Sequence, residues 1–262
     1  MSIFLPIAIV GGIGLVAGVG LAIFAAAMYV PVDERTERLL DALPGLNCGA
    51  CGYSGCAGYA EALVGEGAPA GLCTPGGTDT AAALAGALGV EAGAVAKRRA
   101  FVRCGGGESH CKPGHEYRGE PSCAASALFF GGQRQCGYGC LGFGDCVGAC
   151  PNGAVALRDG VAEVNPALCH GCGICAKACP KKIIVMADAR GGAVSRCASH
   201  APGAVCRKQC GAGCLGCGIC ARACPESAIK VEDNLAVVDA EKCVGCGLCV
   251  GKCPKGCLVM QG

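Results

Sequence analysis

Hydrophobic and polar positions set the first 32 residues apart from the rest of the chain. No charged side chain occurs in residues 1–32, and the 24 residues between Pro6 and Pro31 are nearly all apolar or small. A transmembrane helix needs about 20 such residues. A cleaved signal peptide is the alternative, but it would carry a basic N-terminal region, and no Lys or Arg precedes Arg35. The pattern therefore predicts an uncleaved membrane anchor over residues 1–32.

The anchor has one face of small side chains and one basic flank. Small residues recur every four positions at Gly14, Gly18, Ala22 and Ala26. Such a face allows close helix packing, although ordinary transmembrane glycine content is an equal alternative. Arg35 and Arg38 follow the span, which by the positive-inside rule places the large domain in the cytoplasm. The span contains no charged or amide side chain, so it is a poor ion path.

Residues 33–78 contain four cysteines in the pattern C-x2-C-x4-C-x16-C, namely Cys48, Cys51, Cys56 and Cys73. Four thiolates suffice for one [4Fe–4S] cluster, and a short helix is predicted over residues 59–64. Zinc is the alternative, but zinc sites usually use two separated C-x2-C pairs. Residues 79–130 are interpreted as a linker, helical over 79–100, with a solvated basic end at Lys97, Arg98 and Arg99.

The C-terminal half repeats itself with an offset of 74 and no gap, residues 140–186 matching 214–260. Seven cysteines coincide: Cys140, Cys146, Cys150, Cys169, Cys172, Cys175 and Cys179 with Cys214, Cys220, Cys224, Cys243, Cys246, Cys249 and Cys253. Between the cysteine runs, apolar segments flank residues 158–160 and 232–234, which predicts a β-hairpin in each repeat. Two α+β modules are therefore expected, over residues 131–190 and 205–262.

The cysteine runs follow C-x2-C-x2-C-x3-C-P, the signature of bacterial two-cluster ferredoxins, in which the fourth cysteine ligates the other cluster. The proline is expected to start the helix that leads away. In the second module one predicted ligand set is Cys214, Cys217, Cys220 and Cys253, and the other is Cys224, Cys243, Cys246 and Cys249. In the first module one set is Cys150, Cys169, Cys172 and Cys175.

The remaining set of the first module lacks a cysteine, because Phe143 stands where the second module has Cys217. We expect Cys136 to complete the set with Cys140, Cys146 and Cys179, which brings the expected number of [4Fe–4S] clusters to five. A three-iron cluster or an open iron site is the alternative. A sixth cluster is also a candidate, with ligands from Cys104, Cys111 and Cys123 and from either Cys197 or Cys210. The alternative is that these cysteines are reduced thiols that bind no metal. His110 and His115 are interpreted as surface residues, and Cys206 and Cys257 fit no part of the pattern.

The composition of the chain reduces the number of functions that it could have. The 262 residues include 27 cysteines and 46 glycines but no tryptophan, so bound cofactors rather than a large aromatic core should hold the fold together. The cysteines lie in tight runs, unlike those of a short secreted disulfide scaffold, and reduced thiols belong in a reducing compartment. The formal charge of +2 gives no sign of a nucleic-acid partner. No glycine-rich dinucleotide fingerprint follows a strand, so neither NAD nor flavin is expected on this chain.

These features together resemble the B subunit of the Rnf complex, in its long form with two ferredoxin modules. The resemblance rests on the N-terminal span, the block from Leu43 to Cys48 with its four cysteines, the segment Cys140–Cys146, and the doubled modules. It implies a subunit of a ferredoxin:NAD oxidoreductase that translocates Na⁺ or H⁺ across the bacterial cytoplasmic membrane. It also implies soluble ferredoxin as electron donor, and separate membrane and flavin subunits as partners.

Three other functions compete with this interpretation. One is a membrane reductase that keeps an iron–sulfur transcription factor reduced. Another is a cluster-bearing component of a different membrane redox complex, which the block from Leu43 to Cys73 disfavours. The last is an iron store, which the paired ligand sets disfavour. All but the last share one chemistry, one-electron transfer through clusters that the protein spaces and tunes.

Overall fold

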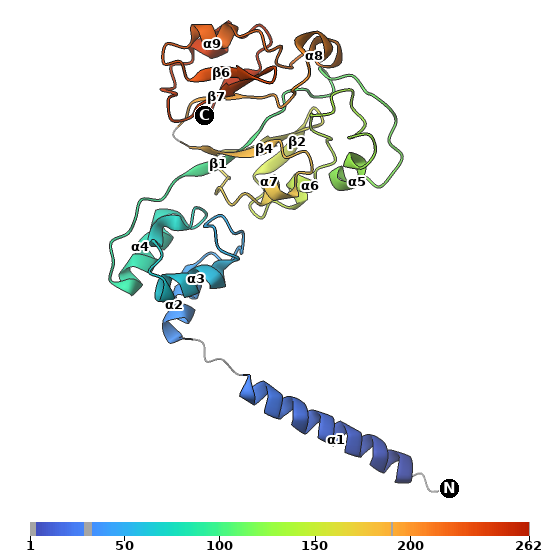
Figure 1. Ribbon diagram of the computed structural model, residues 1–262, viewed down its shortest axis with the longest axis vertical. Coiled ribbons are helices and arrows are strands. Elements are labelled where there is room, and N and C mark those ends of the chain that lie inside the picture. The colour runs from blue at the N-terminus through green and yellow to red at the C-terminus, as the bar shows by residue number, and fades with distance from the viewer. Residues whose placement is uncertain (1–3, 29–32, 190, 262) are drawn as a thin grey trace.

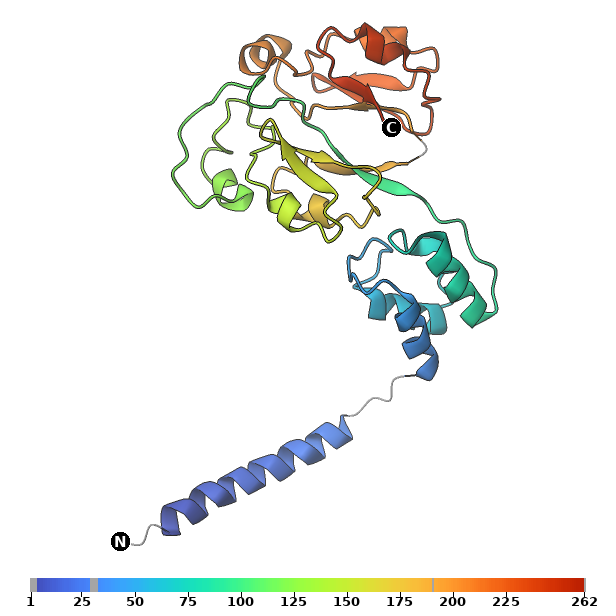
Figure 2. The ribbon, with the colours of Figure 1, turned by 180° about the vertical axis from the view of Figure 1, so that it is seen from behind.

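The computed structural model describes residues 4–28, 33–189 and 191–261. Its parts follow one another along the long axis of the molecule (Figures 1 and 2). Helix α1 (Phe4–Ala27) lies at one end, a small helical domain follows, and two modules of mixed helix and strand occupy the other end. The second module is therefore the part farthest from α1.

Helix α1 is long and apolar enough to cross a membrane. Its segment Ile9–Ala27 has a mean hydropathy of 2.3 and is not buried against any other described part of the protein. This fits the predicted anchor, whose ends at residues 1–3 and 29–32 lie outside the described residues.

The N-terminal domain consists of three α-helices and a 3₁₀ turn: α2 (Glu34–Ala42), α3 (Cys56–Gly65), η1 (Ala70–Leu72) and α4 (Gly77–Leu88). Asp33 caps α2 by accepting a hydrogen bond from the Arg35 N–H. The fully buried Tyr59 donates its hydroxyl to the Pro69 carbonyl, which fixes the chain beyond α3. The helix predicted over residues 59–64 is thus confirmed as part of α3.

The helix predicted over residues 79–100 is wrong in its second half. Helix α4 ends at Leu88, where Gly89 adopts a left-handed φ of 67° that favours glycine. Farther on, Arg98–Val102 forms strand β1, because buried Ala100 and Val102 alternate with more exposed neighbours. The basic residues therefore begin a strand of the first module instead of ending a linker helix.

Each module contains two antiparallel strand pairs and short helices. The first module contains β1, β2 (Val155–Arg158), β3 (Val161–Val164), β4 (Ile184–Asp188), α5 (Cys123–Ala127), α6 (Asp145–Gly148) and α7 (Ile174–Ala178). The second contains β5 (Ala193–Ser195), β6 (Ile229–Glu232), β7 (Leu235–Val238), β8 (Leu258–Met260), α8 (Gly203–Gln209), α9 (Ile219–Ala223) and α10 (Leu248–Lys252). The pairs are β1–β4, β2–β3, β5–β8 and β6–β7.

Both predicted hairpins are confirmed. The turn between β2 and β3 has positive φ at Asp159 and Gly160, and that between β6 and β7 has positive φ at Asp233 and Asn234. Two successive left-handed residues match the twist of a tight hairpin.

The expectation that each Cys-Pro starts a helix is wrong. Helices α7, α9 and α10 lie before the Cys-Pro pairs, and the residues after each proline form a turn that leads into a strand. Left-handed glycines, such as Gly173 and Gly218, precede the helices and redirect the chain into them.

Candidate functional site: a succession of cysteine clusters

The cysteines of the N-terminal domain form a first group, site N, made of Cys48, Cys51, Cys56 and Cys73. Cys56 and Cys73 are buried beside Tyr59, and Cys51 packs against them. Burial raises the pKa of the Cys73 thiol, and the nearby thiols of Cys56, Cys48 and Cys51 raise it further. The structure thus brings together the four residues that the spacing predicts.

A second group, site 1B, lies in the first module and consists of Cys150, Cys169, Cys172 and Cys175. The pKa of Cys175 is raised to about 11, mainly by burial and also by the other three thiols, which lie close by. Backbone N–H groups point at two of the sulfurs: the Ala100 N–H lies 3.4 Å from Cys169 Sγ, and the Ala154 N–H lies 3.3 Å from Cys150 Sγ. Such donors stabilise a thiolate.

A third group, site 1A, contains Cys140, Cys146 and Cys179 as expected, but the structure places Cys123 with them. The four cysteines line one apolar cavity of about 340 Å³. The pKa of Cys146 is raised to about 12, mainly by burial and also by the nearby thiols of Cys140, Cys123 and Cys179. Cys136, our predicted fourth ligand, does not line this cavity and lies on a different one.

Asp145 explains how Cys123 comes to site 1A. One carboxylate oxygen of Asp145 accepts the Cys123 N–H at 2.8 Å, and the other accepts the Ala124 N–H at 3.0 Å and the Ser122 hydroxyl at 3.3 Å. Burial alone would raise the pKa of Asp145, but these hydrogen bonds outweigh it and leave the pKa lowered. Asp145 therefore fixes the start of α5, the helix on which Cys123 is the first residue.

Sequence reasoning missed Asp145, although the repeat contains a signal for it. The second module has Cys217 and Ile219 where the first has Phe143 and Asp145. The two differences occur together: the loop loses its own cysteine and gains a carboxylate that holds one from elsewhere. The Phe143 ring packs against Tyr117, with ring centroids 5.5 Å apart.

The second module brings together both predicted sets. Site 2A (Cys214, Cys217, Cys220 and Cys253) lines a cavity of about 350 Å³. Buried Cys257 lines it as well, with its Sγ 3.4 Å from Cys253 Sγ. Site 2B consists of Cys224, Cys243, Cys246 and Cys249, and the thiols of the first three raise the pKa of Cys249, which burial raises most.

Six further cysteines line a cavity of about 360 Å³ between the two modules. They are Cys104, Cys111, Cys136, Cys197, Cys206 and Cys210, and we call this the intermodule site. Four of the five candidates for a sixth cluster are among them, whereas Cys123 is not. Cys136 and Cys206, which the spacing does not assign to a sixth cluster, lie there too.

Within the intermodule site the thiols gather around two glycines. A side chain at Gly106 would meet Cys210 Sγ at 2.7 Å and Cys104 Sγ at 3.9 Å, and one at Gly139 would meet Cys104 Sγ at 3.8 Å. Cys111 and Cys210 share a hydrogen bond between thiols, which lowers the pKa of Cys111 and raises that of Cys210. At Gly106 a side chain would therefore crowd the Cys210 sulfur, whereas at Gly139 the distances are those of ordinary contact.

Neighbouring sites are linked by pairs of interacting thiols. Cys48 of site N raises the pKa of Cys172 in site 1B, and Cys175 of site 1B raises that of Cys146 in site 1A. Cys104 raises the pKa of Cys140, and Cys197 interacts with both Cys104 and Cys214. The order in space is therefore site N, site 1B, site 1A, the intermodule site and site 2A, with site 2B in the same module as 2A.

Site 1A, site 2A and the intermodule site each gather at least four thiols around a cavity. Four thiols around a cavity are the donor set that a [4Fe–4S] cluster requires. His110 and His115 are exposed, and His110 Nδ1 lies 2.8 Å from the Ser109 hydroxyl.

An apolar N-terminal helix, a four-cysteine domain and two ferredoxin-like modules define a membrane-associated, multi-cluster iron–sulfur protein of electron transfer. Family comparisons agree: an Fe–S cluster family matches residues 43–75, a 4Fe-4S binding domain matches 162–185, and a 4Fe-4S dicluster domain matches 213–257. The predicted α+β class with ferredoxin modules is confirmed.

Three relatives identify the family. The chain is 40% identical to the B subunit of the Na⁺-translocating ferredoxin:NAD⁺ oxidoreductase complex of Acetobacterium woodii, over 92% of this chain and 73% of that one. It is 39% identical to the B subunit of the ion-translocating oxidoreductase complex of Methanosarcina acetivorans, over 90% of both chains. It is 44% identical to the B subunit of the proton-translocating ferredoxin:NAD⁺ oxidoreductase complex of Clostridium ljungdahlii, over 87% of this chain and 81% of that one.

The chain therefore belongs to the family of B subunits of ion-translocating oxidoreductase complexes, the Rnf family, and is an electron-transfer component of such a complex. The predicted resemblance is confirmed.

Proposed function

We propose that this subunit accepts electrons from reduced ferredoxin and passes them, through its clusters, into an Rnf-type complex that reduces NAD⁺ and translocates Na⁺ or H⁺. The observation that carries the proposal is the succession of thiol groups: cavities at site 2A, the intermodule site and site 1A, with the thiols of site 1B packed beside 1A and those of site N in the domain before it. The names of the relatives from Acetobacterium woodii and Clostridium ljungdahlii support ferredoxin and NAD⁺ as the redox partners. The two names differ in the coupling ion, so either ion fits.

Six [4Fe–4S] clusters complete the proposal, and when bound they would carry single electrons. Site N and sites 1B, 2A and 2B would use the ligand sets expected from spacing. Site 1A would use Cys123 in place of Cys136, because Cys123 lines its cavity and Cys136 does not.

The intermodule site would use four of its six thiols. We propose Cys104, Cys111, Cys136 and Cys210, which lie around Gly106 and Gly139. Cys197 accepts N–H groups from Ser199 and Cys214, and it lies on the side toward site 2A. A cluster here would join the two modules, because the site lies between 1A and 2A.

The chain is proposed to cross the membrane once through α1, with its domains in the cytoplasm. Arg35 and Arg38 on that flank and the number of reduced thiols support this orientation. Site N lies in the domain that follows α1, so electrons reaching it would be next to the membrane partners (Figure 1).

Two measurements test the proposal. Anaerobic analysis of the reconstituted full chain should give about 24 iron atoms and as many sulfides, the content of six clusters. Membranes that contain the complex should reduce NAD⁺ with reduced ferredoxin and lose this activity without this chain. Zinc as the main metal, or undiminished NAD⁺ reduction without the chain, would contradict the proposal.

A further inference from the structure

The internal repeat allows the surroundings of two equivalent loops to be compared directly. Loop 169–175 carries three ligands of site 1B, and loop 243–249 carries the matching three of site 2B. In the first module Gly171 and Cys172 are buried, whereas their equivalents Gly245 and Cys246 are exposed. Val244 and Leu248 of the second loop are 67% and 54% exposed.

The N-terminal domain covers the first of these loops. The Lys177 ammonium, in the last turn of α7, donates to the Cys48 carbonyl. A side chain at Gly171 would meet Thr74 Cγ2 at 3.0 Å, and the Cys48 thiol interacts with that of Cys172. A cluster domain therefore sits directly against the loop of site 1B.

The covering domain is acidic. Residues 33–96 contain eight Asp and Glu against two Arg, Arg35 and Arg38. The first module presents the Lys177 ammonium to this domain from the end of α7. Helix α10, the equivalent of α7, also has a basic residue in its last turn: Lys252 is exposed and lies one position after Gly251, the equivalent of Lys177.

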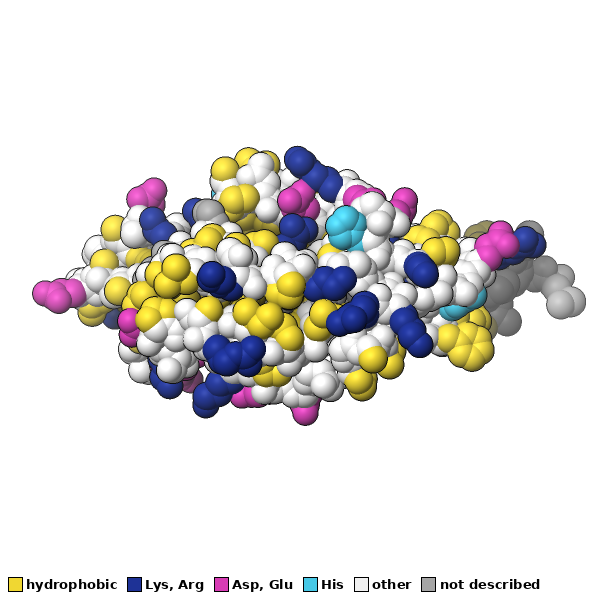
Figure 3. Space-filling model, turned by 90° about the horizontal axis from the view of Figure 1, so that it is seen from above, with side chains coloured by type: hydrophobic (Ala, Val, Ile, Leu, Met, Phe, Trp, Pro, Cys, Tyr) yellow, Lys and Arg dark blue, Asp and Glu magenta, His cyan; other side chains and the backbone are white. Residues whose placement is uncertain are grey.

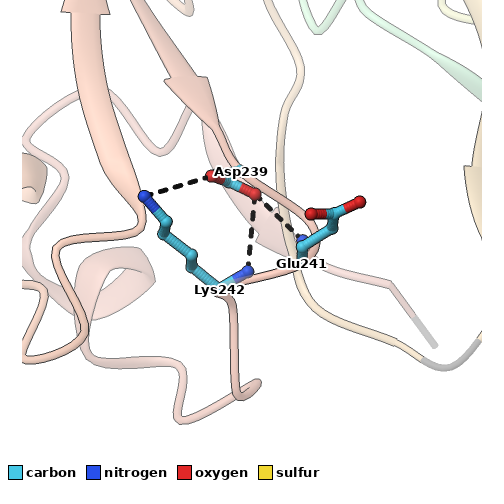
Figure 4. A network of polar contacts seen from close by, with 3 residues as sticks. All are labelled: Asp239, Glu241 and Lys242. Atoms are coloured by element: carbon cyan, nitrogen blue, oxygen red, sulfur yellow. Dashed lines mark hydrogen bonds and ion pairs between the residues drawn. The ribbon is translucent and has the colours of Figure 1, made fainter.

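The loop of site 2B is held in shape although it is exposed. Asp239 accepts the backbone N–H groups of Glu241 at 3.0 Å and Lys242 at 3.4 Å, and it pairs with the Lys242 ammonium at 3.7 Å (Figure 4). Asn165 makes the equivalent turn in the first module, accepting the Ala167 N–H. The exposed loop therefore begins with the same hydrogen-bonded turn as its covered counterpart.

The surrounding surface favours an acidic partner. Figure 3 looks down on this end of the molecule, where Lys and Arg side chains gather over the middle of the face among hydrophobic ones, while Asp and Glu lie mostly toward its edge. Such a distribution attracts acidic proteins by long-range electrostatics.

We propose that loop 243–249, together with Lys252, is the docking surface for an acidic iron–sulfur carrier protein of the ferredoxin type. The carrier would sit on the second module as the N-terminal domain sits on the first, with Val244 and Leu248 as its apolar contacts. Cys224, Cys243, Cys246 and Cys249 would hold the cluster of site 2B, which would take one electron from the reduced carrier without any bond forming or breaking. The proposal rests on the proposed function and adds where the donor binds.

The test is stopped-flow reduction of the purified, cluster-loaded full chain in detergent by a reduced bacterial two-cluster ferredoxin. The double variant V244E/L248E should lower the second-order rate constant about tenfold or more, because it adds acidic charge and removes apolar contact. K252E should lower it too and weaken its dependence on salt. The control V205E changes another exposed valine, on α8 and 43% exposed, and should keep the unaltered rate.

Dithionite separates docking from cluster damage, because this small reductant should reduce all three variants and the unaltered chain alike. If V244E/L248E is reduced by ferredoxin as fast as the unaltered chain, the docking surface is refuted. The same holds if that variant instead loses only its association with other subunits, since the loop is then a subunit interface. If ferredoxin reduces not even the unaltered chain, the proposed function itself fails.

Discussion

The sharpest prediction concerns Asp145, which holds Cys123 at site 1A. The variant Asp145→Asn keeps the size of the side chain but removes its charge. It also turns one acceptor oxygen into an amide donor that faces backbone N–H groups. In the variant Cys123 should be held only loosely at site 1A, so that the cluster there loses its fourth protein ligand.

The magnitude follows from the hydrogen bonds. The carboxylate accepts two backbone N–H groups at 2.8 and 3.0 Å and a hydroxyl at 3.3 Å. A hydrogen bond to a charged group contributes about 1.5–3 kcal/mol. Because Asp145 is only half-buried, the free energy that holds the start of α5 in place should fall by about 2–3 kcal/mol in the variant. A loss of that size shifts the equilibrium between the bound and displaced positions of Cys123 by about 30- to 150-fold toward the displaced one.

The assay is electron paramagnetic resonance of the full chain under mild oxidant. Asp145→Asn should convert one four-iron centre to a three-iron signal and lose about one iron per chain. Cys123→Ala should do the same. Glu163→Gln removes only a surface ion pair with Arg158, and should leave the spectrum unchanged.

The pH dependence gives a second check. Because the pKa of Asp145 is lowered in the folded chain, its stabilising contribution is present above the unfolded pKa of about 3.9 and is lost only as pH falls below it. The difference in iron content and in three-iron signal between the variant and the unaltered chain should therefore be the same at pH 6 and pH 8. Full iron content and no three-iron signal in Asp145→Asn would refute the reasoning.

Three other predictions concern separate features. Cys210→Ala should remove the cluster of the intermodule site and stop electron passage between modules, whereas Cys206→Ala should keep it; six intact clusters in Cys210→Ala would exclude our ligand set. Lys181→Met should lower the reduction potential of site 1A in an EPR-monitored titration, because Lys181 lines the cavity of this site and its positive charge interacts with the Cys179 thiol; an unchanged potential would exclude this role. Gly14→Leu or Gly18→Leu should weaken copurification with partner subunits without changing iron content, because no described part of the chain lies within 4 Å of a side chain placed at these glycines; unchanged copurification would leave the small face without a role.

Local patterns along the chain were enough to predict several elements. Charge-free residues predict α1, alternating apolar runs around two turn residues predict both hairpins, and the C-x2-C-x2-C-x3-C-P runs predict the ferredoxin modules. The reason is that each element depends on periodicity or spacing within a few residues, which can be read directly from the sequence. The same logic failed at residues 79–100, where local composition indicated a helix and pairing with β4 made Arg98–Val102 a strand.

Packing between distant segments determines which cysteines meet across long stretches of chain. Cys136 is near Cys140 in sequence, yet Cys123 lines the cavity, because the Asp145 carboxylate fixes the start of α5 beside it. Cys104 and Cys210 come from different modules and meet only because the modules pack together. Spacing gives the ligands that the C-x2-C-x2-C-x3-C-P runs supply, including the fourth cysteine of each run, whereas a ligand from outside the runs, such as Cys123, depends on hydrogen bonds and packing between elements.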